Sequence, residues 1–281
     1  MYSMRGVHGI EAGRLKGHAV SGTKMDIILL VAVFSVFLVA LIFSMFGQGG
    51  GSVYTPTLFL LGFAVLVSTS TSLVLNLITS TSAGYIFYRN KMIDFKTSLI
   101  FVPGICVGSL IGGVLGNFVD AAFLLWLFVF FLIAVGARMI YTYWEKGNAE
   151  GECPAGFSTA MYALIVSVGF AVGILSGLLG VGGGILIVPF MVYICKYPTK
   201  YAAGSSHLII SFSALFGIIG HSAFGSLDLQ LILVTGVAVL IGGNLGARIS
   251  MKFKSGTLKA GLGLIMWALA IQLTLKLTGM I

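Results

Sequence analysis

The chain contains the stretch Gly47-Gln48-Gly49-Gly50-Gly51-Ser52, and its pattern recurs in the second half as Gly180-Val181-Gly182-Gly183-Gly184-Ile185. A proline follows each copy at the same spacing, Pro56 in the first and Pro189 in the second. Both copies lie within apolar sequence that is long enough to cross a bilayer several times. Lipid cannot satisfy irregular backbone, so glycine loops at membrane depth must be buried in protein or line a cavity. We therefore interpret the chain as a duplicated membrane protein with one glycine loop in each half.

The composition supports this interpretation. Of the 281 residues, 58% are hydrophobic and only 9% are charged, whereas soluble domains carry about 25% charged residues. The net charge of +8 comes from basic residues between apolar runs, which is typical of juxtamembrane positions and not of a nucleic-acid-binding face. The three cysteines, Cys106, Cys153 and Cys195, are far apart and predict neither a disulfide framework nor a metal site.

Apolar runs of helical length predict an all-α polytopic membrane protein. Most of them approach the ~20 residues that a helix needs to cross a bilayer, but the second and the seventh are shorter and follow the glycine loops. These two are predicted to be part-depth helices, with Thr55-Pro56 as the start of the first and Pro198 as the stop of the second. The ten predicted segments are about 26–46, 52–67, 69–88, 97–116, 121–143, 158–180, 184–196, 203–223, 228–248 and 257–278.

The distribution of lysine and arginine predicts the orientation. Basic residues concentrate at 89–96, 196–200 and 248–259, whereas the loop at 224–227 has none. Placing the basic loops in the cytoplasm puts 224–227 outside, and the halves are then two inverted repeats of five segments each. Alternatively, eight spans in a parallel 4+4 duplication would keep the basic N-terminal tail inside but place 196–200 and 248–259 outside. The predicted units are an N-terminal tail (1–25) and one transmembrane domain (26–281), made of repeat 1 (26–143), a linker (144–157) and repeat 2 (158–281).

The repeat extends beyond the glycine loops. Ile93-Asp94-Phe95 aligns with Leu227-Asp228-Leu229, and Thr71-Ser72 aligns with Ser205-Ser206. We expect both aspartates to cap helices. A G-G-x-x-G motif at Gly112 matches one at Gly242, and we expect both motifs to allow close helix packing.

The glycine loops predict an anion site. Glycine permits positive φ and a close approach of backbone to ligand, and a helix N-terminus presents unpaired N–H groups to an anion. Hydroxyls matched across the repeat can donate to an oxyanion and still release it, and His207 follows them with a side chain that titrates near neutral pH. The alternative is that the glycines permit packing and the hydroxyls bond backbone carbonyls. The predicted binding residues are Gly49, Gly50, Gly51, Ser52, Thr71, Ser72, Gly182, Gly183, Gly184, Ser205, Ser206 and His207.

Several of these motifs resemble those of a known family. The duplicated G-x-G-G-G-x-x-x-x-P pattern, the Ser-Ser-His segment at 205–207 and the G-G-x-x-G-A-R motif at Gly242–Arg248 are similar to the TauE/SafE sulfite-exporter family over roughly residues 26–278. The resemblance implies transport of sulfite, a sulfonate, thiosulfate or a related small anion across the cytoplasmic membrane. The first copy departs from the second at Gln48, which leaves open whether the halves contribute equally to the site.

Two other classes of function are alternatives to an alternating-access transporter. A passive anion channel would share the same glycine loops. An intramembrane hydrolase is less well supported, because His221 and Ser222 are neighbours on a helix and do not face each other. Without a phosphate-binding P-loop, energy would come from an ion gradient, the membrane potential or the substrate gradient. We expect no enzymatic activity, cofactor or metal. The expected partners are the anion and the bilayer, and not nucleic acid. A homo-oligomer is compatible with the sequence.

Overall fold

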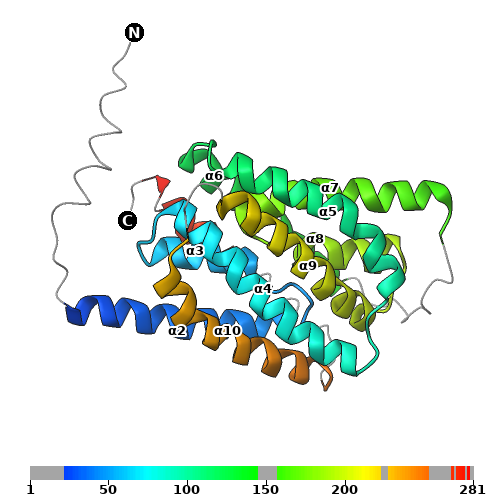
Figure 1. The fold of residues 1–281 in the computed structure, drawn as a ribbon, viewed down its shortest axis with the longest axis horizontal. Coiled ribbons are helices and arrows are strands. Elements are labelled where there is room, and N and C mark those ends of the chain that lie inside the picture. The colour runs from blue at the N-terminus through cyan, green and yellow to red at the C-terminus, as the bar shows by residue number, and fades with distance from the viewer. Residues whose placement is uncertain are drawn as a thin grey trace, which may run out of the picture.

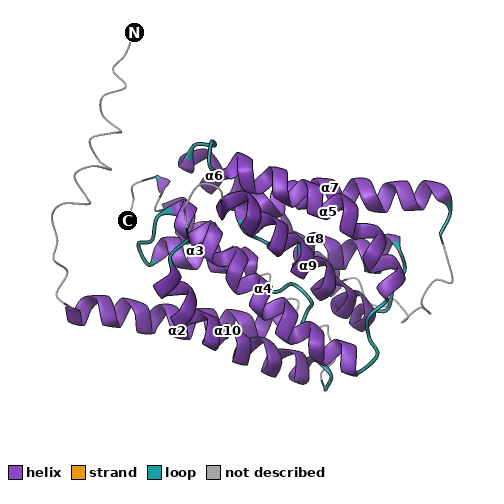
Figure 2. Ribbon diagram, viewed as in Figure 1, coloured by secondary structure: helices purple, strands orange, loops and turns teal. Residues whose placement is uncertain are grey.

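The protein forms a bundle of helices. Its structure is a computed structural model, which describes residues 22–144, 157–222 and 227–252, together with 267–268, 270–275 and 277–278. No strand occurs within these ranges (Figure 2). Residues 1–21 of the predicted tail, residues 145–156 of the linker and much of the last segment lie outside the described residues, and the first described helix begins at Gly22, within the predicted tail. The elements are α2 (Gly22–Ser44), α3 (Gly51–Leu60), α4 (Val65–Arg89), α5 (Phe95–Gly116), α6 (Ala121–Trp144), α7 (Thr159–Leu179), α8 (Gly184–Pro189), the π-helix η1 (Phe190–Ile194), α9 (Thr199–Ser222) and α10 (Leu229–Ser250).

The long helices confirm a polytopic all-α protein. Among the described residues, α2, α4, α5, α7, α9 and α10 are each long and apolar enough to cross a membrane. The two short elements also lie where they were predicted. With 10 residues, α3 rises about 15 Å, roughly half of a bilayer core of about 30 Å. The element after the second loop is α8 followed by η1, and it ends at Ile194.

Two predicted helix boundaries are wrong. The first short helix begins at Gly51, with Gly50 as its N-cap, and Pro56 lies inside it. The left-handed conformation of Gly50 (φ 109°) turns the chain into the helix before Thr55-Pro56 is reached. The second short element ends before Pro198, whose carbonyl instead accepts a hydrogen bond from Ala202 in the first turn of α9.

The two halves pack mainly against each other. Helix α5 packs along α7, and its repeat counterpart α10 packs along α2. Helix α5 also contacts α9, α10 contacts α4, and α4 and α9 pack together at the centre. In Figure 1, α2 runs from left to right, whereas its counterpart α7 starts at the right and runs left. Neither half could bury its apolar surface alone, so the duplicated chain forms one bundle.

Glycines make this packing close, as expected for both G-G-x-x-G motifs. A Cβ atom on Gly112 would overlap the carbonyl oxygen of Ile174 in α7, and one on Gly242 would lie 2.7 Å from that of Phe37 in α2. The aspartates matched across the repeat are also confirmed as helix caps. Asp94 accepts from Lys96 N, and Asp228 accepts from Leu231 N.

The basic loops meet at one end of the bundle. Lys200 Nζ donates to Met251 O at 3.2 Å, and Met92 and Ile93 pack near Met251. Asp94 N donates to Ser205 Oγ at 2.9 Å, which ties the loop before α5 to the start of α9. The predicted clustering of positive charge is therefore a three-dimensional feature that combines loops from both halves.

Candidate anion site

The two glycine loops have the same backbone conformation. In each loop, three glycines are left-handed, and the last of them is the N-cap of the short helix that follows. Residues other than glycine rarely adopt these angles, because the Cβ atom would meet the backbone. The matched φ values are 72° and 70° for Gly47 and Gly180, 75° for both Gly49 and Gly182, and 109° and 76° for Gly50 and Gly183.

The loops lie directly against each other. A Cβ atom on Gly51 would lie 2.5 Å from Val181 O, and one on Gly184 would lie 2.8 Å from Gln48 Cα. The N-termini of α3 and α8 therefore meet inside the bundle. Within the described part of the chain, the N–H groups of 49–51 and 182–184 donate to no backbone carbonyl. Unpaired N–H groups and the positive ends of two helix dipoles create a site that favours an anion.

Two of the predicted hydroxyls hold this arrangement together. Ser72 Oγ donates to Gly180 O at 2.8 Å, and Ser206 Oγ donates to Gly47 O at 2.5 Å. Each serine thus binds the first glycine of the loop in the opposite half, and the two bonds are equivalent under the repeat. Because both hydroxyl protons point at carbonyls, we assign Ser72 and Ser206 a positioning role.

Asn76 occupies the centre of the site. Its Nδ2 donates to Val181 O at 3.1 Å, while its Oδ1 has no partner. A Cβ atom on Gly49 would overlap Asn76 Oδ1, and one on Gly182 would overlap Asn76 Nδ2. The glycines are therefore required here partly because the Asn76 amide fills the space between the loops. Sequence reasoning did not place Asn76 in the binding set; its position four residues after Ser72, on the same face of α4, was the available signal.

Unpartnered polar atoms surround Asn76. A Cβ atom on Gly49 would also lie 2.7 Å from Ser80 Oγ, so Asn76 and Ser80 face the same point of the first loop. Buried polar atoms without a hydrogen bond are rare and costly in folded proteins, so such a group indicates a place for a ligand or water. Atoms of this kind near the loops and along α4 are Gln48 Oε1, Ser52 Oγ, Ser68 Oγ, Thr71 Oγ1, Asn76 Oδ1, Ser80 Oγ and His207 Nδ1.

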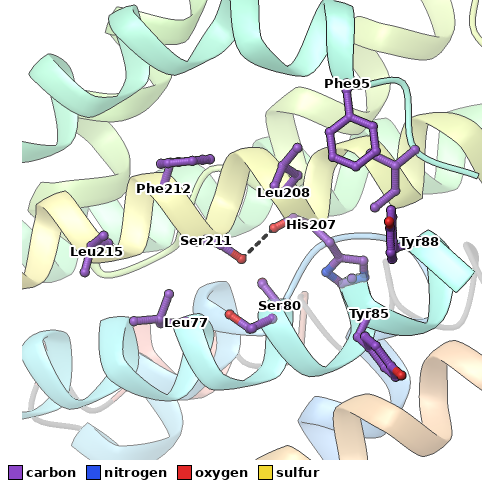
Figure 3. Close-up of a pocket in the computed structure, with 13 residues that line it drawn as sticks. Leu77, Ser80, Tyr85, Tyr88, Phe95, His207, Leu208, Ser211, Phe212 and Leu215 are labelled. Carbon is purple, nitrogen blue, oxygen red and sulfur yellow. Dashed lines mark hydrogen bonds between the residues drawn. The ribbon is translucent and has the colours of Figure 1, made fainter.

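A cavity of about 480 Å³ leads to this group between α4 and α9. Ser80 and His207 line it and point into the space between the two helices (Figure 3). Tyr88 and Phe95 line its other end, next to the basic loop at 89–96. The cavity therefore extends from the basic end of the bundle to Ser80 and His207, and Ser80 lies beside Gly49 of the first glycine loop.

His207 is held in one orientation. Its Nε2 lies 2.9 Å from Ser44 O, and its ring packs 5.4 Å from the ring of Phe87, centroid to centroid. A carbonyl oxygen can only accept, so Nε2 carries a proton and donates. The neutral ring then has a bare Nδ1, which has no partner among the described residues.

Of the remaining predicted residues, two glycines cap the short helices and one serine lies away from the loops. Gly50 and Gly183 form the helix N-caps, and a Cβ atom on Gly50 would lie 2.7 Å from the Tyr54 ring. Ser205 does not join the loops, because its hydroxyl accepts from Asp94 N. His221, considered above only as a partner of Ser222 in a hydrolase, is fully buried.

The chain was compared with known proteins. The family model "Sulfite exporter TauE/SafE" matches residues 32–273. The Bacillus subtilis (strain 168) probable membrane transporter protein YunE is 27% identical over 249 residues, covering 82% of this chain and 91% of that protein. YdhB, a probable membrane transporter protein of the same strain, is 29% identical over 229 residues, covering 80% and 89%. A probable membrane transporter protein of Xylella fastidiosa (strain 9a5c) is 27% identical over 256 residues, covering 86% and 94%. No solved structure matches the chain.

Proposed function

The chain belongs to the sulfite exporter TauE/SafE family, and we propose that this multi-pass membrane transporter moves a small sulfur-containing anion across the cytoplasmic membrane. Sulfite, sulfonates and thiosulfate are the substrates that the family implies. The observation that carries the proposal is the meeting of the N-termini of α3 and α8 beside buried polar atoms that lack partners.

The chemistry of the site favours an anion over a cation. Among the described residues, no carboxylate lines the cavity, and none belongs to the group of unpartnered atoms around Asn76. The site offers backbone N–H groups, serine hydroxyls and the second N–H of the Asn76 amide. Each helix N-terminus adds about half a positive charge. These donors suit the several oxygens of a sulfur oxyanion. The described lining residues include no lysine or arginine, so no fixed positive side chain there would oppose release.

We also propose that the halves are inverted and that transport proceeds by alternating access. The exchange of partners between halves and the opposite directions of α2 and α7 support inversion. Because the basic loops gather at one end, the rule that basic loops stay inside assigns that end to the cytoplasm. The cavity between α4 and α9 then opens inward, and rearrangement of the two halves would open the equivalent path on the opposite side.

Flux measurements test the function. Purified protein in liposomes should take up ³⁵S-labelled sulfite, thiosulfate or a sulfonate, and the label should be recovered chemically unchanged. A carrier predicts saturation and counterflow exchange with unlabelled anion, whereas a channel predicts neither. Protein-free liposomes give the background. Uptake that equals this background for all three anions would refute the proposed substrate class.

Cysteine labelling tests the inverted topology. In a background without Cys106, Cys153 and Cys195, we expect Arg89→Cys to react with a membrane-impermeant maleimide only from the cytoplasmic side and Leu227→Cys only from the other. The reason is that the basic residues near Arg89 favour the cytoplasm, whereas the loop at Leu227 has none. Labelling of both from one side would exclude inversion.

A further inference from the structure

We propose that His207 binds a proton together with the anion, so that each transported anion crosses the membrane with one proton. This inference rests on the proposed function and deepens it, because it names the coupling ion and the atom that carries it. The atom is Nδ1, which belongs to a fully buried side chain in the wall of the cavity.

The geometry of the ring makes Nδ1 the site of proton uptake. The Ser44 carbonyl fixes the Nε2 proton, so the neutral ring can only accept at Nδ1. Nothing in the described part of the chain donates to that lone pair. A proton that arrives from the cavity therefore binds Nδ1 and converts it into a donor. No covalent bond other than this N–H forms or breaks, and the proton leaves by the same atom.

Charge compensation provides the reason for coupling. An unpaired anion in a water-poor site costs several kcal/mol, which the protein has to offset. Among the described residues that line the cavity there is no lysine or arginine, and the tyrosines among them are Tyr85 and Tyr88. Among these lining residues, His207 is therefore the side chain that becomes positive when it takes up a proton, and its charge would neutralise one negative charge of the ligand.

The other charged groups near His207 are occupied or lie in solvent. The group of α2 that faces the ring is the Ser44 carbonyl, which accepts the hydrogen bond from Nε2. In the loop before α5, the Asp94 carboxylate accepts from Lys96 N, Thr97 Oγ1 and the Tyr197 hydroxyl. The exposed charged side chains there and at the end of α4 are Arg89, Lys91 and Lys96. These three cations at the cavity mouth attract anions but do not reach the buried ring.

The chain contains a matched control in His221. Both histidines lie on α9, and each Nε2 is 2.9 Å from a carbonyl in the last turn of the helix before a glycine loop, Ser44 O for His207 and Gly177 O for His221. These two carbonyls are equivalent in the repeat. His221 packs against Gly116, where an added Cβ would lie 3.0 Å from its ring, and it does not line the cavity. Replacing His221 therefore removes a similar hydrogen bond without touching the site.

Thiosulfate binding as a function of pH is the test. Thiosulfate stays fully ionised between pH 5.5 and 8.5, so any proton taken up on binding resides on the protein; sulfite would not allow this distinction. For wild-type protein we expect the Kd of ³⁵S-thiosulfate to rise about tenfold per pH unit over the upper part of this range, as coupling to one proton requires. His207→Gln should flatten this dependence, whereas His221→Gln should retain it.

A direct measurement of proton movement tests the coupling in the wild-type protein, without any variant. When wild-type protein in liposomes takes up thiosulfate along its gradient, an entrapped pH-sensitive dye should report acidification of the lumen. Thiosulfate uptake without acidification, or a wild-type pH dependence in His207→Gln, would overturn the role of His207 and leave the transport function standing. An absence of thiosulfate, sulfonate and sulfite binding in the wild type would overturn both.

Discussion

The two glycine loops have the same backbone but different chemistry. Their left-handed glycines match in position and conformation, and each loop is tied by a serine from the opposite half. The polar atoms without partners, however, belong mostly to the first half. The repeat places Val181 opposite Gln48, Ile185 opposite Ser52, Ile210 opposite Asn76 and Ala214 opposite Ser80.

This difference separates two constraints that act on the same sequence. The turn into each short helix requires glycine, so the backbone constraint applies equally to both copies. The polar side chains are present in one copy and replaced by apolar ones in the other, which fits the proposal that one small anion is bound by one set of side-chain donors. A nearly symmetric scaffold thus presents one asymmetric candidate site, to which the second half contributes the N–H groups of its own loop and His207.

The largest effect is expected where the halves are alike. Gly49→Ala and Gly182→Ala should each reduce transport about 100-fold or more, because either methyl group would displace the Asn76 amide, and misplacement by about 1 Å can cost this much. Initial rates of ³⁵S-thiosulfate uptake in liposomes provide the measurement. Gly62→Ala is the control, because Gly62 has φ 101° but open space around it. It should cost about 1–2 kcal/mol of stability, because an L-residue is strained at positive φ, and leave the rate unchanged. A strong effect in only one of the two loops would break the equivalence of their backbones.

A smaller effect should mark where the halves differ. Asn76→Ala removes a hydrogen-bonding group that faces the proposed anion, and we expect the Kd of thiosulfate to rise roughly 10- to 100-fold, the equivalent of about 1.5–3 kcal/mol. Ile210→Ala is the matched change in the other half. It should lower the unfolding temperature, because it empties apolar space beside Gly184, but should leave the Kd within about twofold. Equal losses of affinity in both variants would show that both halves bind the ligand.

The smallest effect concerns the two bonds between the halves. Ser72→Ala and Ser206→Ala each remove one hydroxyl that donates to a glycine carbonyl of the opposite loop. Hydrogen bonds of this kind inside membrane bundles contribute about 0.6 kcal/mol on average, so we expect small and similar decreases in unfolding temperature in detergent. If one variant unfolds and the other does not, the two bonds are not equivalent and the symmetric description of the scaffold is wrong.

Sequence alone determined the features that depend on local chemistry. The glycine loops, the two short helices and the long spans follow from residue types within a few positions of each other, as do the caps at Asp94 and Asp228. Thr55-Pro56 misled the prediction, because the pair suits a helix start locally. Its role was overridden by Gly50, whose left-handed turn starts the helix at Gly51, where the chain lies against the second loop.

Only the tertiary structure decided which polar groups form the site. Thr71-Ser72 and Ser205-Ser206 match in the repeat, yet Ser205 caps a distant loop while Asn76, with an apolar counterpart, reaches both glycine loops. Which face of α4 meets the opposite half depends on how α4, α5, α9 and α10 exchange partners. The face of α4 that meets the opposite half is set by the packing of whole helix surfaces, which brings together residues far apart in the chain. The periodicity of residues within one segment cannot predict it.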